Sequence, residues 1–246
     1  VAALYSINSE TMKHLTDNLI VDDKEKRKIK FLVEQWIESI SPSNFLATNP
    51  EAQKLFFDTK GESFFNGLEN LAEDFHKGKI SQTDESAFEI GKDLATTEGS
   101  VIYENEVIQL IQYKPTTNTV SSTPFMIVPP CINKFYIMDL QPKSSFVKFA
   151  LDSGNSVFLV SWKNAGQNES HLLWDDYVER GIINSINVVL SVSNKRKVNT
   201  LGFCIGGTLL ATAISVLQGR GENRVNSLTL MASLLDFNDP GILEIF

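Results

Sequence analysis

A single cysteine lies in a glycine-rich turn, in a pattern that suits covalent catalysis. The order is Gly202-x-Cys204-x-Gly206-Gly207, with an apolar run before it and a helix-like run after it. A nucleophile elbow has this design: a strand ends, the chain turns sharply and a helix begins, which leaves the reactive side chain strained and exposed. The glycines remove Cβ atoms where strand and helix approach closely. We therefore predict Cys204 as a nucleophile at an elbow built by these glycines.

The helix that follows the turn would assist this thiol electrostatically. The first N–H groups of a helix have no partner within it, and its dipole is positive at that end. Both features favour a thiolate and a developing oxyanion. The backbone N–H of Ile205, directly after the nucleophile, is the expected oxyanion donor. Two simpler interpretations compete: glycines that only permit tight packing, and a cysteine that serves as a small hydrophobe.

The amino-terminal part of the sequence predicts helices. Apolar residues recur at three- and four-residue spacings over residues 29–40 and 64–75, which is typical of amphipathic helices. Between them, "SPSNFLATNP" predicts a loop that leads into a helix from Pro50 or Glu51. We interpret the aromatic residues of the 64–75 stripe as core packing. The helical region is assigned to residues 1–98.

The pattern changes near residue 100, where short apolar runs begin to alternate with helix-length segments. This alternation predicts a mostly parallel sheet with right-handed crossovers. We assign residues 99–235 to this α/β core. The predicted strands lie within "SVIYENEVIQLIQYKP", "TPFMIVPP", "NSVFLVSW", "KVNTLGF" and "RVNSLTLMASLL", and the predicted helices span 138–153, 172–193 and 206–218.

Composition excludes several classes of protein. The net charge of −8 argues against a general nucleic-acid binder, which needs a basic surface. The two cysteines, Cys131 and Cys204, are too few for a disulfide framework and indicate a reducing cytoplasm. No apolar run approaches the roughly 18 residues expected of a membrane span. Histidine and acidic residues nowhere show ligand spacing, so we expect no metal and no cofactor.

Beyond the cysteine box, the sequence resembles the polyhydroxyalkanoate synthases. Blocks similar to theirs follow in the same order from about residue 41 to the end. The "NFLATNP" block is most similar to single-subunit enzymes that use short-chain monomers. The blocks are "SPSNFLATNPEA", "TDESAFEIGKDLA", "LIQYKPTT", "PPCINKFYIMDLQPKSSFV", "VFLVSWKN", "WDDYVERGI" and "LLDFNDPGILEIF".

The resemblance implies an acyltransferase with an α/β-hydrolase-type fold. Such an enzyme polymerises (R)-3-hydroxyacyl-CoA, here most directly 3-hydroxybutyryl-CoA, and releases CoA, while Cys204 carries the acyl chain as a thioester. It also implies a cytoplasmic enzyme, homodimeric when intact, on the surface of polyester granules. Acyl-CoA and the growing polyester are its expected partners, with no nucleic acid and no transmembrane segment.

The same resemblance suggests a second oxyanion donor. In the hydrolase fold it comes from the loop after the third strand, which here is "PPCIN". The backbone N–H of Ile132 is the candidate, with that of Cys131 next. We interpret the Cys131 thiol itself as unreactive. Asp175 and Asp176 stand at a predicted helix start, where acidic residues suit the dipole without a catalytic role.

A base and its acidic partner are missing from the expected places. In the family, Asp and then His follow the nucleophile, whereas every histidine here precedes it. The aspartates that follow the nucleophile are Asp236 and Asp239. Both lie in residues 236–246, which resemble the beginning of a cap segment. We therefore expect an amino-terminal portion of a synthase, with an incomplete sheet, that is inactive alone. The histidines are His14 and His76 on predicted helices, and His171 before the "WDDY" segment.

Two other functions stay open at this point. A thiol-based α/β hydrolase similar to dienelactone hydrolases would release free acid and no polymer. A non-catalytic module could instead use the apolar helical stripes to bind granules or another subunit.

Overall fold

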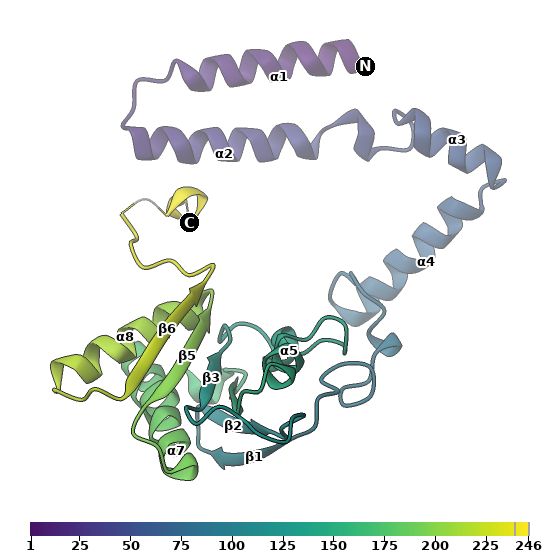
Figure 1. Ribbon diagram of the computed structural model, residues 1–246. Helices are drawn as coiled ribbons and strands as arrows, with labels where there is room; N and C mark the ends of the chain where they lie inside the picture. Colours follow the sequence, from purple (N-terminus) through teal and green to yellow (C-terminus); the bar gives the residue numbers. More distant parts are fainter. Residues whose placement is uncertain (239, 246) are drawn as a thin grey trace. The chain divides into compact units, whose positions relative to one another are not determined.

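The computed structural model describes residues 1–238 and 240–245 and divides into two units (Figure 1). One unit comprises residues 1–84 and the segment after residue 238, and the other comprises Glu85–Asn238. Asp239, considered above as an aspartate after the nucleophile, lies outside the described residues, as does Phe246. The domain boundary at residue 98 stays a prediction.

The first unit is helical, and side-chain caps set two of its helix starts. The Asp22 carboxylate accepts hydrogen bonds from the N–H groups that open α2, and the Asn49 side chain does the same for α3. Pro50 occupies the first turn of α3, where a missing N–H costs nothing. The helices are α1 (Ala2–Asp17), α2 (Asp23–Ser39), α3 (Pro50–Asp58) and α4 (Glu62–Lys77), with short 3₁₀ turns at Pro42–Asn44 and Gly241–Ile245.

The interpretation of the 64–75 stripe as core packing is wrong. Phe64, Phe65, Leu68, Leu71 and Phe75 are all exposed, and Phe75 retains 78% of its accessible surface. The neighbouring rings of α3 and α4 pack edge to face on one another and do not close a core. Hydrophobic periodicity predicts that a helix has an apolar face, but it does not predict what covers that face.

The second unit is built on a six-stranded sheet of order β1-β2-β4-β3-β5-β6. Strands β4, β3, β5 and β6 are parallel, whereas β1 and β2 form an antiparallel hairpin that pairs with β4. The predicted α/β fold with a mostly parallel sheet is confirmed. The strands are β1 (Gly99–Glu104), β2 (Ile108–Tyr113), β3 (Phe125–Val128), β4 (Val157–Trp162), β5 (Val198–Phe203) and β6 (Val225–Met231).

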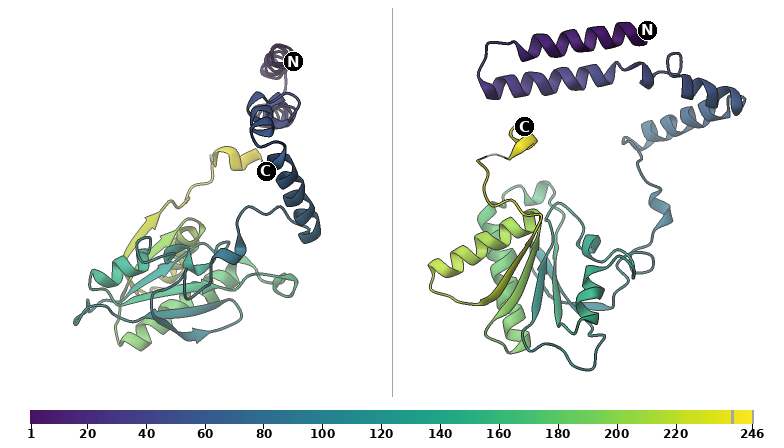
Figure 2. Two further views of the ribbon diagram at one scale, coloured as in Figure 1. Left: turned by 90° about the vertical axis from the view of Figure 1, so that its right-hand side faces the viewer. Right: turned by 45° about the horizontal axis from the view of Figure 1, so that its top comes forward.

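Helices cover both faces of this sheet (Figure 2). Alternate residues of each strand enter separate cores: Phe158 and Val160 face the core shared with α7 and α8, while Val157 and Leu159 face the core shared with α5. The helices are α5 (Phe146–Asp152), α6 (Trp174–Asp176), a π-helical segment η5 (Tyr177–Ile183), α7 (Asn184–Ser193) and α8 (Ile205–Gly219).

The helix expected over 138–153 is shorter than predicted, since α5 begins only at Phe146. Ser145 caps it by accepting the Lys148 N–H at 2.8 Å. Before the cap, the chain is held by buried Asp139, whose carboxylate accepts hydrogen bonds from the hydroxyls of Thr97 and Ser145 at 2.6 Å each. Over the described residues, no helix is both long and apolar enough to cross a membrane.

Candidate active site

Cys204 occupies the turn between β5 and α8 in a strained conformation. Its φ of 53° and ψ of −129° lie in a region that non-glycine residues rarely adopt. Its N–H donates to the Met231 carbonyl at 2.9 Å, which anchors the turn to β6. The side chain is exposed at the carboxyl end of the parallel strands. This is the geometry that the elbow pattern predicts.

The three elbow glycines are required by close approach. A Cβ on Gly202 would lie 2.8 Å from the Gly207 backbone N, and one on Gly207 would lie 2.7 Å from the Ser233 Cβ. A Cβ on Gly206 would lie 2.7 Å from the Pro129 carbonyl carbon. The strand, the first turn of α8 and the loop after β3 therefore pack with no room for side chains at these positions.

The first turn of α8 leaves a donor beside the thiol. The Gly207 N–H turns back to the Cys204 carbonyl at 2.9 Å, while the Ile205 N–H donates to no acceptor in the part of the chain that the structure describes. Such an unpaired N–H at a helix start suits a negative oxygen. Ile205 thus stands where the sequence predicts an oxyanion donor, and its role stays a prediction.

The loop after β3 is fixed by a tryptophan to which sequence reasoning gave no role. The buried Trp162 Nε1–H donates to the Pro129 carbonyl at 2.8 Å. The indole also stacks on the Tyr177 ring, with centroids 5.7 Å apart, and covers Gly181, where a Cβ would meet it at 2.6 Å. No local sequence pattern marks this contact, because its two residues stand 33 positions apart.

Ile132, the second predicted donor, lies in this loop. Its side chain is 81% exposed, and within the described residues its N–H donates to no acceptor. Cys131 beside it is half-buried against the core, and burial raises the pKa of its thiol. A negative charge on Cys204 would add to that rise.

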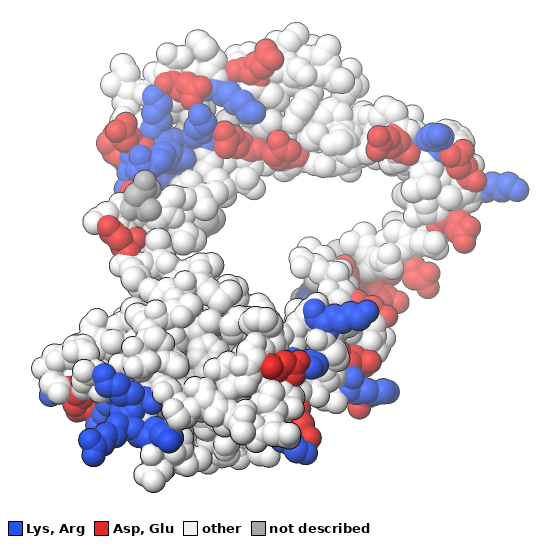
Figure 3. Space-filling model, viewed as in Figure 1, with Lys and Arg blue, Asp and Glu red and all other residues white. Residues whose placement is uncertain are grey.

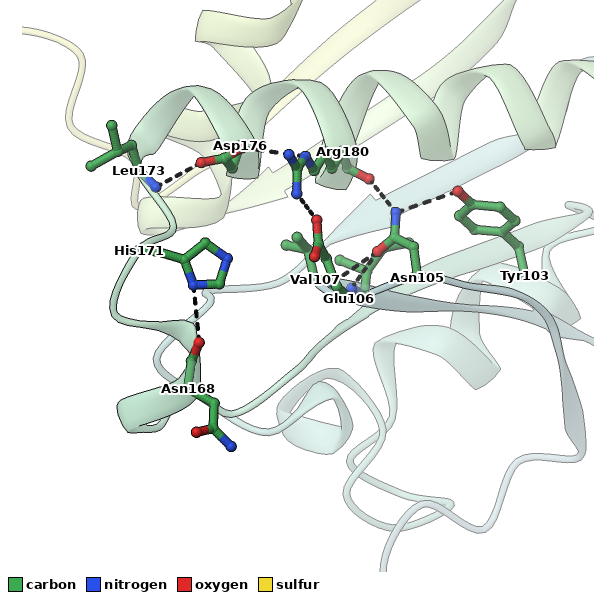
Figure 4. A network of polar contacts seen from close by, with 10 residues as sticks. Tyr103, Asn105, Glu106, Val107, Asn168, His171, Leu173, Asp176 and Arg180 are labelled. Atoms are coloured by element: carbon green, nitrogen blue, oxygen red, sulfur yellow. Dashed lines mark hydrogen bonds and ion pairs between the residues drawn. The ribbon is translucent and has the colours of Figure 1, made fainter.

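His171 is exposed and bonded within its own loop. Its Nδ1–H donates to the Asn168 carbonyl at 2.9 Å, and Figure 4 shows the ring away from the neighbouring polar network. No contact of the described residues joins it to Cys204 or to a carboxylate. The geometry therefore gives His171 no place in a triad-like arrangement.

The polar network in Figure 4 is structural. The Asp176 carboxylate accepts the Leu173 N–H at 2.9 Å and caps α6, and it pairs with Arg180 at 3.2 Å. Arg180 also pairs with Glu106, while its carbonyl accepts the Asn105 side-chain N–H at 2.9 Å. These contacts fix the α6–η5 helix to the β1–β2 hairpin and account for Asp176 without catalysis.

Basic residues gather at the opposite end of the strands, seen as the lower-left blue group in Figure 3. Lys195, Arg196 and Lys197 precede β5, and Arg224 precedes β6. A six-residue strand spans about 20 Å, roughly twice the screening length at physiological salt. These cations therefore contribute little to the field at Cys204.

Comparison with known proteins identifies the family. The model for the poly-beta-hydroxybutyrate polymerase (PhaC) N-terminus matches residues 1–150. The chain belongs to this family. A second model, for the alpha/beta hydrolase fold, matches residues 124–246 and contains the elbow. The two matches overlap over residues 124–150, which include β3 and the Ile132 loop that follows it.

Curated polymerases are similar over nearly the whole chain. The poly(3-hydroxyalkanoate) polymerase subunit PhaC of Cupriavidus necator is 50% identical over 245 residues, which is 100% of this chain and 42% of the relative. The corresponding subunit of Rhizobium meliloti is 38% identical over 92% of this chain and 38% of its own length. The chain therefore spans about two fifths of the length of these relatives.

Proposed function

We propose that this chain is the nucleophile-bearing part of an acyltransferase that polymerises (R)-3-hydroxyacyl-CoA, most directly 3-hydroxybutyryl-CoA, into polyhydroxyalkanoate. One observation carries the proposal: an exposed cysteine lies in a positive-φ turn at the start of a helix, in a chain that is 50% identical to a polymerase over 100% of this chain's length. A thiol hydrolase is less favoured, because the relatives described above are named polymerases.

In the proposed reaction, the Cys204 thiolate attacks the thioester carbonyl of the acyl-CoA. The C–S bond to CoA breaks, CoA leaves as a thiol after taking up a proton, and the acyl group remains on Sγ. The negative oxygen of the tetrahedral intermediate accepts hydrogen bonds from the N–H groups of Ile205 and Ile132. Their lack of another acceptor within the described residues supports this assignment.

A cysteine suits polymerisation better than a serine. Transfer from CoA to Cys204 exchanges one thioester for another, so little free energy is lost. Attack by a hydroxyl of the monomer or chain end then converts a thioester into an ester, which is downhill. A serine ester would lose that driving force one step too early.

Replacing the nucleophile in the longer polymerase tests this assignment. In a complete gene product that contains these residues, Cys204→Ser should lower CoA release from 3-hydroxybutyryl-CoA by at least about 100-fold. A matched hydroxyl change on the same helix, Ser215→Ala, removes only a bond to the Ala211 carbonyl and should leave the rate unchanged. Undiminished polymer synthesis by Cys204→Ser would contradict the thioester mechanism.

We further propose that the base and its acidic partner lie downstream of these 246 residues. The 246-residue chain alone should therefore release CoA at a rate near background. Turnover comparable with a complete polymerase would overturn this part of the proposal and would require a base within the chain.

We also propose that the enzyme is cytoplasmic and binds granules, and the exposed stripe on α4 supports the granule contact. Phe65, Leu68 and Phe75 offer apolar surface that a polyester could cover. Replacing all three by Gln should lower co-sedimentation with polyester granules several-fold, while charge-neutral changes at Asn66 and Asn70 on the same helix should not. Equal sedimentation would contradict this role. We also propose that the complete enzyme is a homodimer, which light scattering of the complete enzyme would test.

A further inference from the structure

Both thiols of the chain emerge at the same edge of the sheet. Strands β3 and β5 are parallel neighbours, and Val128 lies opposite Gly202 in their register. Cys131 follows three residues after the first of this pair, and Cys204 follows two residues after the second. The two thiols therefore leave adjacent strands at nearly the same height.

The backbones that carry the thiols are in direct contact. Gly206 touches the Pro129 carbonyl, since a Cβ there would lie 2.7 Å from that carbonyl carbon. Neighbouring strands are about 4.8 Å apart, and a disulfide needs Cα atoms about 4.4–6.8 Å apart. In the described structure, one backbone bond, from the Asn133 N–H to the Pro130 carbonyl at 3.3 Å, ties the Cys131 loop to itself. The Trp162 bond holds the start of the loop at Pro129, and beyond it Cys131 can shift without breaking a bond of the sheet.

The two thiols differ in access to an oxidant. Cys204 is exposed, whereas Cys131 is half-buried. Burial, and then the charge of Cys204, raises the pKa of Cys131, which keeps that thiol protonated and a poor target for peroxide. We therefore expect Cys204 to be oxidised first, and Cys131 to be the second thiol that reacts with it.

We propose that Cys131 and Cys204 form a reversible disulfide under hydrogen peroxide. In the first step, the Cys204 thiolate attacks peroxide, the O–O bond breaks, hydroxide leaves, and Cys204 becomes a sulfenic acid. In the second, the Cys131 thiol displaces the sulfenic hydroxyl, which departs as water with the Cys131 proton. The disulfide shields Cys204 from irreversible oxidation, and a dithiol reductant restores both thiols.

Mass mapping of the whole 246-residue chain tests the proposal directly. After treatment with hydrogen peroxide, digestion under non-reducing conditions should yield one linked peptide pair that joins Cys131 to Cys204 within a single chain. Dithiothreitol should restore both free thiols. A Cys204–Cys204 link between two chains, or sulfinic acid at Cys204 with Cys131 still free, would overturn it. This readout is independent of polymerase activity, so it can fail while the proposed function stands.

A Cys131→Ser variant provides the second arm. Without Cys131, we expect the sulfenic acid of Cys204 to persist and then proceed to the irreversible sulfinic acid. Recovery of the Cys204 thiol by dithiothreitol should fall several-fold below that of the unchanged chain, while circular dichroism verifies that the variant is folded. Equal recovery in the two proteins would contradict the role of Cys131.

Discussion

The two units of the chain use apolar residues in opposite ways. In the α/β unit, the strands and their covering helices bury side chains such as Phe158 and Leu209 almost completely. In the helical unit, Ile37 is the large apolar side chain buried within the described residues, at 2% exposure, while α4 presents its apolar stripe to solvent. Apolar side chains thus form a closed core in the α/β unit and an open surface on α4.

This contrast separates what stabilises the fold from what remains available for binding. Removing a buried ring destabilises the folded protein, because the transfer free energy and the packing contacts of the ring are both lost. Removing an exposed ring costs the protein little stability. We therefore expect matched substitutions in the two units to differ sharply in their effect on the free energy of unfolding.

Removing a phenylalanine should give the largest difference. Phe158→Ala in β4 empties a site that is 1% exposed, and we expect a loss of about 3–5 kcal/mol in the free energy of unfolding. Phe75→Ala on α4 should change it by less than about 0.5 kcal/mol. Urea titration followed by circular dichroism measures both. Similar losses would mean that the α4 stripe is packed in solution.

Adding a methyl group should give effects of opposite sign. Gly206→Ala forces a Cβ into the Pro129 backbone, and we expect a loss of about 2–3 kcal/mol. Gly67→Ala, in the open middle of α4, meets no atom within 4 Å and should stabilise its helix by up to about 1 kcal/mol. Thermal unfolding of both variants checks this prediction. A neutral Gly206→Ala would contradict the close packing at the elbow.

A tryptophan pair sharpens the comparison further. Trp162→Phe leaves the Pro129 carbonyl without its donor, and we expect a loss of about 1–2 kcal/mol together with faster alkylation of Cys131. Trp36→Phe in α2, where the side chain is 51% exposed, should change stability by less than about 0.5 kcal/mol. Urea unfolding and mass-resolved alkylation report the two effects. An unchanged rate of Cys131 alkylation would contradict the claim that Trp162 holds the loop after β3 in place.

The smallest effect should be a pH dependence in the helical unit. The Glu25 N–H, followed by that of Lys24, lowers the pKa of Asp22 below its usual value of 3.8. The cap therefore stabilises α2 above that pH, and its contribution is lost as the pH falls through the lowered pKa. Asp22→Asn keeps the acceptor without titrating, so its helix content should fall less on acidification. Identical acid titrations by circular dichroism would contradict the cap.

The sequence alone predicts much of the site, because close-packed turns demand particular residues. The elbow at Cys204 is readable since only glycine fits at Gly202 and Gly206. The contact of Trp162 with Pro129 joins residues 33 positions apart, so local pattern cannot reveal it. The start of α5 was missed for a similar reason, because buried Asp139 holds the preceding segment through contacts distant in sequence. The exposure of α4 was missed because periodicity does not identify neighbours.

Trapping the acyl adduct tests most directly whether Cys204 is the residue that carries the acyl chain. A complete gene product that contains this chain would be mixed briefly with 3-hydroxybutyryl-CoA, quenched in acid and digested. We predict a 3-hydroxybutyryl group on the peptide that contains Cys204, released by hydroxylamine, and absent from Cys131. An adduct on Cys131 or on a serine, with Cys204 unmodified, would contradict the account.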